Sequence, residues 1–277
     1  MKECLGLGYT KHFLLFTTSL LACSVLEISP SQAATIALSQ GNLLFTNFSQ
    51  SPSSSFTSTD INAVSISQDG SVTSQADAIA YLGATPPVGF NYTSNQALSE
   101  NQGSSGLGES EATIKGIFDV DKNTHFSFNF VADLDLTTFT DNPRQEKASA
   151  SGNLGFALID IANNNVLDYF NVDGSLTTAG NDSLSHKNSK NVGFSTFTRS
   201  NLGGQQEFTT ATFDGYLNRH FHNKTTVALV AVNATKSNVA APVPSMLPAL
   251  VLSWGVISVG LKRKRQKNSG TCLLEKK

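Results

Sequence analysis

Apolar and polar residues alternate through the central part of the chain, and no long stretch there has the 3.6-residue repeat of an amphipathic helix. The clearest alternation covers residues 125–137, where the even positions from Phe126 to Leu136 are all apolar. The odd positions between them are mostly polar. Because successive side chains of a strand point to opposite faces, this segment is predicted to form a strand with one buried and one solvent-facing side.

The same pattern predicts several further strands. A hairpin is expected over residues 151–172, with its turn at Asn163-Asn164-Asn165, because Asn tolerates positive φ. Gln68-Asp69-Gly70 and Val172-Asp173-Gly174 are further turn signals. The other predicted strands, rich in Thr, Ser, Val and Phe, cover residues 35–46, 56–67, 71–82, 111–120, 206–221 and 225–232.

These strands predict an all-β fold, an antiparallel β-sandwich or jelly roll in a single exported domain over residues 34–236. The sequence has 18 Phe and one Trp, which indicates a core filled by Phe. Residues 94–108 and 177–190 are rich in Ser, Asn, Gly and Gln or Lys, so both are predicted to be long surface loops. Residues 237–241 are expected to form a short linker.

The N-terminus has the layout of a secretory signal peptide with a signal helix. Lys2 and Lys11 precede an apolar run of 14 residues over positions 13–26, which is too short for a membrane-spanning helix. Ser31-Gln32-Ala33 then places small residues at alternate positions. We expect residues 1–33 to be removed by signal peptidase, with the cut after Ala33 or one residue later, after Ala34. The alternative is a lipobox at residues 20–23, which would make Cys23 the acylated first residue.

The C-terminus contains a second targeting pattern. Pro242-Val243-Pro244-Ser245 precedes an apolar stretch over residues 246–261, and Lys262-Arg263-Lys264-Arg265 follows it. Sixteen helical residues span roughly 24 Å, and snorkelling basic side chains can make up the difference from the hydrocarbon thickness. The clustered cations would hold this end and the tail of residues 266–277 in the cytoplasm, with the body outside. A plain tail anchor is one interpretation of this pattern.

The other interpretation is a resemblance. Residues 242–265 resemble the PEP-CTERM sorting signal of bacteria, and most of all its cyanobacterial variant written PTPA; the body is similar to other cyanobacterial exported proteins. The matching features are Pro242 to Ser245, then Leu247-Pro248-Ala249-Leu250 within a short apolar helix, then the basic cluster. Val243 stands where the commonest version has an acidic residue. The resemblance implies recognition by an exosortase, a membrane protease that cuts near the motif and releases or re-anchors the body.

The charge and the cysteine content of the body argue against some classes of function. The net charge is −2, but residues 35–240 contain 18 Asp and Glu against 10 Lys and Arg, so the body carries about −8. An acidic body argues against a nucleic-acid partner, which rewards clustered Lys and Arg. The three cysteines, Cys4, Cys23 and Cys272, all lie outside the body, which therefore offers no thiol nucleophile or thiolate metal site.

Three groups of residues are candidates for chemistry. Asp119, Asp121 and Asn123 have a spacing that could present oxygens to Ca²⁺, but Thr124 and Phe130 stand where an EF-hand needs Gly and Glu, so a turn is the simpler interpretation.

His220 and His222 would lie on one side of a strand. They could chelate Zn²⁺ or Cu²⁺, but no third ligand is near in sequence. Asp133 and Asp135 share the solvent face of their strand, and they could serve glycoside hydrolysis only with a partner across a cleft. No aromatic platform for a sugar is evident beside them. No catalytic motif, metal site or cofactor site is predicted.

The leading hypothesis is an exported, non-enzymatic protein of the cell surface or extracellular matrix with a structural or adhesive role. It would first be anchored in the inner membrane by the C-terminal helix. Signal peptidase and an exosortase-like protease are the expected processing partners, and extracellular polysaccharide is a further partner. A carbohydrate-binding module, with or without Ca²⁺, is the alternative, and a hydrolase is the third possibility.

Overall fold

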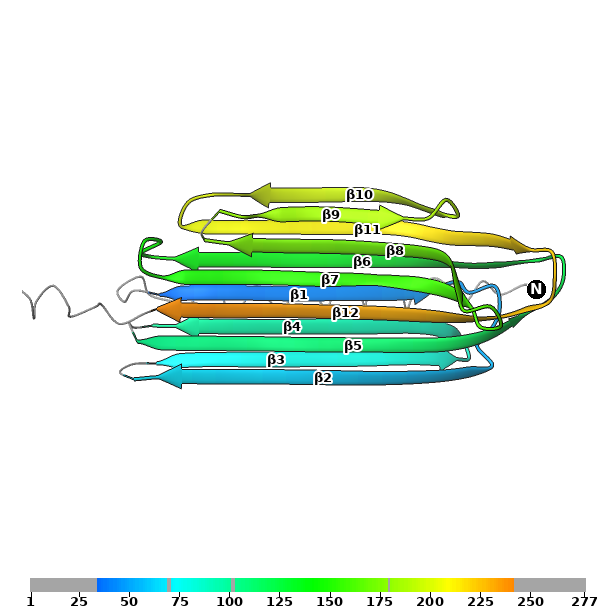
Figure 1. The fold of residues 1–277 in the computed structure, drawn as a ribbon, viewed down its shortest axis with the longest axis horizontal. Coiled ribbons are helices and arrows are strands. Elements are labelled where there is room, and N and C mark those ends of the chain that lie inside the picture. Colours follow the sequence, from blue (N-terminus) through cyan, green and yellow to red (C-terminus); the bar gives the residue numbers. More distant parts are fainter. Residues whose placement is uncertain (1–33, 69–70, 101–102, 179, 242–277) are drawn as a thin grey trace, which may run out of the picture. The chain divides into compact units, whose positions relative to one another are not determined.

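The computed structural model describes residues 34–241 apart from 69–70, 101–102 and 179. The regular elements in this part of the chain are strands: β1 (Thr35–Thr46), β2 (Ser54–Ser67), β3 (Val72–Ala84), β4 (Pro87–Ser99), β5 (Ser104–Val120), β6 (Thr124–Thr140), β7 (Lys147–Asp160), β8 (Asn165–Thr177), β9 (Ser183–Asn188), β10 (Val192–Asn201), β11 (Gln206–Phe221) and β12 (Thr225–Ala241). They form two six-stranded antiparallel sheets that pack against each other (Figure 1). Sheet A has the order β10-β11-β6-β1-β4-β3, and sheet B has the order β2-β5-β12-β7-β8-β9. The all-β antiparallel sandwich is confirmed.

Alternation predicts several of these elements closely. The strand expected over residues 125–137 is part of β6, and its apolar even positions are all buried. The expected hairpin is β7–β8, whose turn includes Asn164 at a φ of 53°. This positive φ is the conformation for which Asn is suited. The predictions of a signal helix and a C-terminal helix concern residues outside the described part of the chain.

Two segments predicted as long loops form strands instead. Residues 94–108 belong to β4 and β5, and only residues 100–103 connect these strands. Residues 177–190 contain β9. The predicted linker, residues 237–241, is the last part of β12, so the sandwich extends beyond the expected domain end at residue 236. The composition of residues 94–108 was misleading because β4 and β5 face a polar interior.

One half of the interior is filled by phenylalanine, as predicted. Phe118, Phe126, Phe128, Phe130 and Phe156 are each at most 4% exposed. The rings of Phe128 and Phe130 contact Phe156 edge to face, with centroid distances of 5.2 and 5.1 Å. Edge-to-face pairs are a favoured aromatic geometry, and burial of such large rings contributes strongly to the stability of a core.

The other half of the interior contains many buried polar side chains beside a small apolar cluster of Ala37, Ala97, Ala148 and Val239. Thr93 and Asn95 on β4 face Asn233 and Thr235 on β12, and all four side chains are buried. Thr93 Oγ1 donates to Asn233 Oδ1 at 2.9 Å, and Asn95 Nδ2 donates to Thr235 Oγ1 at 2.7 Å. Buried polar groups are costly unless they are hydrogen-bonded. These pairs therefore favour one alignment of the two sheets over others.

Glycines allow a close approach of the sheets in this polar half. A Cβ atom on Gly41 of β1 would overlap the side-chain amide of Asn233 in the opposite sheet. A Cβ atom on Gly108 of β5 would lie 2.6 Å from the backbone oxygen of Gln75 on β3. Small residues such as Gly108 do not give the apolar periodicity of an ordinary strand, which is why residues 94–108 were predicted to be a loop.

The first strand starts and the last strand finishes at the same end of the sandwich, which is called a pole below. Thr35, the first residue of β1, pairs with Ser99, and Ala241, the last residue of β12, pairs with Ser104 at the other side of the β4–β5 turn. The Gly103 N–H in this turn donates to the Ala241 carbonyl. The first and last strands of the described chain therefore begin and end at one end of the sandwich. Within the described ranges, the chain has no helix of the length and apolarity that crossing a membrane requires.

Candidate functional site

Two carboxylates occupy the centre of the outer face of sheet A. Asp133 and Asp135 are on β6, which lies between β1 and β11, and both side chains point away from the Phe core. Asn42 of β1 and Thr212 of β11 are the cross-strand neighbours of Asp133. The sequence prediction that the two carboxylates share the solvent face of the strand is confirmed, although both are half-buried there.

The surroundings of these carboxylates raise the pKa of both. Burial is the main cause for Asp133, and hydrogen bonds from Thr212 and Asn42 partly offset it. Asn42 Nδ2 lies 3.2 Å from Asp133 Oδ2. Burial also raises the pKa of Asp135, a hydrogen bond from Thr210 lowers it, and the charge of Asp133 raises it further. Loss of hydration disfavours a carboxylate, so these groups hold protons to a higher pH than exposed aspartates do.

A depression of about 240 Å³ lies beside Asp135 on the same face. The residues that line it come from four strands and include Tyr92, Gln40, Asp77, Ser94, Gln96 and Asp135. Strand pairing alone produces this group, because Asp77, Ser94, Gln40 and Asp135 are successive cross-strand neighbours on β3, β4, β1 and β6. The depression combines carboxylates, amides and hydroxyls with one aromatic ring.

Further aromatic side chains share this outer face. The rings of Phe90 and Tyr92 are stacked at 6.4 Å with an interplanar angle of 10°. Tyr81 on β3 and Tyr216 on β11 are more than half exposed. Arg199 lies 5.5 Å from the ring centroid of Phe208. Phe90 and Tyr92 are two residues apart on one strand, but Tyr81, Phe208 and Tyr216 lie on other strands, and only the sheet brings all these rings to one face.

A second depression, of about 420 Å³, lies on the outer face of sheet B. It is bordered by acidic residues, including Glu109, Glu111 and Asp173, and no aromatic residue lines it. Lys236 Nζ and Glu109 Oε1 form an ion pair at 2.6 Å. The hydrogen bond from Lys236, followed by that from Asn62, lowers the pKa of the Glu109 carboxyl. This depression therefore has charge but no ring on which a sugar could stack.

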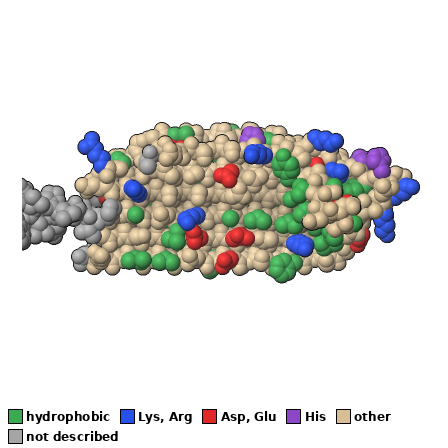
Figure 2. All heavy atoms as spheres, viewed as in Figure 1, with side chains coloured by type: hydrophobic (Ala, Val, Ile, Leu, Met, Phe, Trp, Pro, Cys, Tyr) green, Lys and Arg blue, Asp and Glu red, His purple; other side chains and the backbone are tan. Residues whose placement is uncertain are grey.

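Three histidines meet at the pole opposite Ala241. His125 of β6 is the cross-strand partner of His220 of β11, and His222 follows two residues later. The ring centroids of His220 lie 4.8 Å from His125 and 4.5 Å from His222. Desolvation, then the charges of His222 and His125, lower the pKa of His220. Figure 2 shows histidines gathered near one end of a surface that is largely uncharged.

His125 is the third histidine that the sequence did not reveal, because it lies far from the other two along the chain. A cross-strand register, rather than a spacing motif, brings it to the pair. Even so, among the residues described between 34 and 241, no group of three or more His, Cys, Asp or Glu side chains is arranged to hold a metal ion.

Of the calcium candidates, Asp119 lies at the end of β5, and Asp121 and Asn123 belong to the turn between β5 and β6. Asp119 Oδ1 accepts from Thr226 Oγ1 at 2.8 Å, and the Asp121 carbonyl accepts from Thr124 Oγ1 at 2.7 Å. Asn123 has a φ of 58°, as a tight turn between β5 and β6 requires. These contacts support the interpretation of this spacing as a turn.

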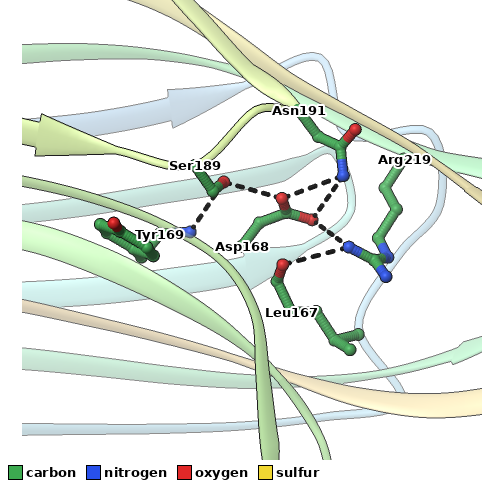
Figure 3. A network of polar contacts seen from close by, with 6 residues as sticks. All are labelled: Leu167, Asp168, Tyr169, Ser189, Asn191 and Arg219. Carbon is green, nitrogen blue, oxygen red and sulfur yellow. Dashed lines mark hydrogen bonds and ion pairs between the residues drawn. The ribbon is translucent and has the colours of Figure 1, made fainter.

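A buried carboxylate that the sequence did not single out joins the two sheets near β8. Asp168 accepts from Ser189 Oγ at 2.7 Å, from Asn191 Nδ2 at 3.0 Å and from Arg219 NH1 at 2.8 Å (Figure 3). Arg219 also donates to the Leu167 carbonyl at 3.1 Å. All the polar groups around Asp168 belong to the fold itself, so the network is structural and leaves no acceptor aimed at a ligand.

Most of the predicted processing residues lie outside the described part of the chain: Ala33, Pro242, Val243, Pro244, Ser245, Lys262, Arg263, Lys264 and Arg265. Ala34 lies within it. Its side chain is buried, and its backbone N–H donates to Asp141 Oδ2 at 2.8 Å. The expected cut after Ala33 would therefore place a new amino group beside a carboxylate.

This chain was compared with protein-family models, curated proteins and solved structures. No family model, curated protein or solved structure matches this chain.

Proposed function

We propose that this chain is an exported, non-enzymatic binding protein of the cell envelope, and that the outer face of sheet A binds extracellular polysaccharide. The signal-like residues 1–33 and the sorting-like residues 242–265 support export and processing. The acidic, cysteine-free body supports a role in an open aqueous space. Signal peptidase would cut after Ala33 or Ala34, and an exosortase-like protease would act near Pro242 to Ser245.

The depression beside Asp135 is the observation that carries the binding proposal. Sugars offer apolar ring faces and many hydroxyls, so they are held by an aromatic surface together with carboxylate and amide groups. Tyr92 provides the ring, and Asp135 and Gln96 provide a carboxylate and an amide within the same depression. At about 240 Å³ the depression is smaller than typical pockets for small molecules, which favours one residue of an extended polymer.

The positions of the carboxylates favour binding over hydrolysis. Asp77 and Asp135 are separated by three strand spacings, or about 14 Å, which is too far for the acid pair of a glycosidase. Asp133 and Asp135 project from the same side of one strand and do not flank a bond across a cleft. Each also accepts a hydrogen bond from a neighbouring threonine.

Glycan binding by the purified exported protein tests the proposal. A glycan array, probed with calcium and again with EDTA, should give polysaccharide signals that Tyr92→Ala and Asp135→Asn weaken at least tenfold. Tyr169→Ala and Asp173→Asn are matched controls, because they remove one ring and one carboxylate from the sheet B side. Absence of binding in both conditions, or equal losses in the controls, would reject the sheet A surface.

Processing is tested separately by the intact mass of the native protein in envelope and medium fractions. A chain that starts at Ala34 or Thr35 and ends near Pro244 supports both proteolytic steps. A chain with its complete C-terminus leaves a plain membrane anchor. Acylation at Cys23 would replace the proposed signal-peptidase cut by lipoprotein maturation.

A further inference from the structure

Strand β2 is an open edge of sheet B with an unusual degree of exposure. It pairs only with β5, and all 14 of its residues are exposed. Phe56, Ile61 and Ile66 are 61%, 58% and 61% exposed. An edge strand presents unpaired backbone N–H and C=O groups, which are a template for another strand.

The usual protections of an edge are absent from β2. It pairs with β5 in one register from Ser54 to Ser67 without a bulge. It contains no proline and no lysine, and Asp60 is its only charged residue. A long, regular and nearly uncharged edge with exposed apolar side chains is the kind that pairs with other chains. A strand that pairs with β2 must match the pattern of its side chains.

The β2 sequence is complementary to itself. In an antiparallel pair of β2 strands related by a twofold axis at Ile61, Phe56 lies opposite Ile66 of the second copy. Asp60 lies opposite Asn62, and Ile61 lies opposite itself. The large apolar residues therefore meet each other, and the single carboxylate meets an amide.

Neighbouring registers are less favourable. Strand pairs that keep the outer face of both copies on one side shift by two residues at a time. A shift in one direction places Asp60 opposite Asp60, and like charges directly opposite are destabilising. A shift in the other direction places Asp60 opposite Val64 and moves Phe56 beyond the end of the partner strand.

We propose that β2 is a self-association edge, through which two copies of this chain join antiparallel about Ile61 and extend sheet B across both molecules. The contact is isologous, so it closes as a dimer. Backbone hydrogen bonds between the two β2 strands hold the copies together. The Phe56–Ile66 and Asp60–Asn62 pairs determine the register. This proposal does not depend on the polysaccharide surface, which belongs to the other sheet.

Crosslinking of the full-length chain in mild detergent tests the register. Cys4, Cys23 and Cys272 are first replaced by Ser, and a short bismaleimide is added. Ile61→Cys should crosslink to itself with high yield. Tyr216→Cys is the matched control, because Tyr216 is 55% exposed but lies on an interior strand. Phe56→Cys mixed with Ile66→Cys should crosslink, whereas either variant alone should not.

Light scattering after size exclusion tests the affinity. Ile61→Lys places two cations on the axis and should convert the dimer to a monomer, or weaken it at least tenfold, whereas Tyr216→Lys should leave it intact. A monomeric unmodified chain, equal crosslinking at positions 61 and 216, or a dimer unaffected by Ile61→Lys would each overturn the proposal. The crosslinking variants keep the test valid if Ile61→Lys fails to fold.

Discussion

Arg219 and Asp168 connect the two sheets through an ion pair that is mostly hidden from water. Arg219 NH1 on β11 of sheet A lies 2.8 Å from Asp168 Oδ2 on β8 of sheet B, and the side chains are 26% and 1% exposed. Ser189 and Asn191, after β9, donate to the same carboxylate. The edge of the sandwich that carries the short strand β9 is thus held by one polar centre.

Loss of Arg219 should destabilise the fold. Arg219→Ala would leave the buried Asp168 carboxylate without its cation, which we expect to lower the free energy of unfolding by roughly 2–4 kcal/mol. Urea unfolding at neutral pH measures this effect. Arg199→Ala is the control, since Arg199 is exposed and contacts only a ring face; it should cost about 1 kcal/mol or less. Equal losses in both variants would contradict a special role for the Asp168 centre.

The polar interior should be sensitive to isosteric change. Thr93→Val keeps the side-chain shape but removes the donor to Asn233 Oδ1, leaving a buried acceptor without its partner. We expect a loss of about 1–3 kcal/mol in urea unfolding. Thr137→Val, on the outer face of β6, makes the same chemical change beside solvent and should cost less than about 0.5 kcal/mol. If Thr93→Val leaves the free energy of unfolding unchanged, the Thr93–Asn233 pair does not stabilise the sandwich.

The raised pKa values of Asp133 and Asp135 should make the stability of the fold depend on pH. Burial raises the pKa of both in the folded state above the ordinary value of 3.8, so the folded chain binds more protons than the unfolded chain above about that pH. Stability must then fall as pH rises through the folded-state pKa values. Relative to wild type, Asp133→Asn/Asp135→Asn should be more stable at neutral pH, with a gap that closes towards about pH 3. Unfolding curves across this range test it, and a gap that widens in acid would refute the sign.

If signal peptidase cuts after Ala33, we expect an ion pair between the new amino group of Ala34 and Asp141. A cut after Ala33 would turn the Ala34 amide into an ammonium group beside Asp141 Oδ2, strengthening the existing 2.8 Å contact. Asp141→Asn should then lower the stability of the mature protein by about 1–2 kcal/mol. Asp121→Asn, in the exposed β5–β6 turn, should have little effect. N-terminal sequencing joined to thermal unfolding checks both points; a mature chain that begins at Thr35 would rule out the pair.

Alternation of apolar residues identified β6, but it did not identify β4. Alternation over residues 126–136 identified β6 because every inward position is Phe, Leu or Ala. The β4 strand failed this test, since its inward positions include Asn91, Thr93 and Asn95. A periodicity of apolar residues cannot detect a strand whose buried side chains are polar, and their partners lie on β12 and β5 of the facing sheet.

The candidate site was predictable only within single strands. The shared face of Asp133 and Asp135 followed from their spacing of two residues. The grouping of Asp135 with Asp77 and Tyr92 required the order β3-β4-β1-β6, and no local pattern encodes which strands become neighbours. The same reason hid His125 from His220. Contacts between distant strands are decided by the whole sheet.

The position of β12 has a mechanical consequence. This strand ends at Ala241, pairs with β5 along its full length and also pairs with β7 over residues 227–240. A tether after Ala241 would pull along the strand axis, so the load would be shared in shear by both ladders instead of peeling one hydrogen bond at a time. If the body were anchored through the residues after Ala241, as proposed, the load would enter at β12, which has a hydrogen-bonded neighbour on each side.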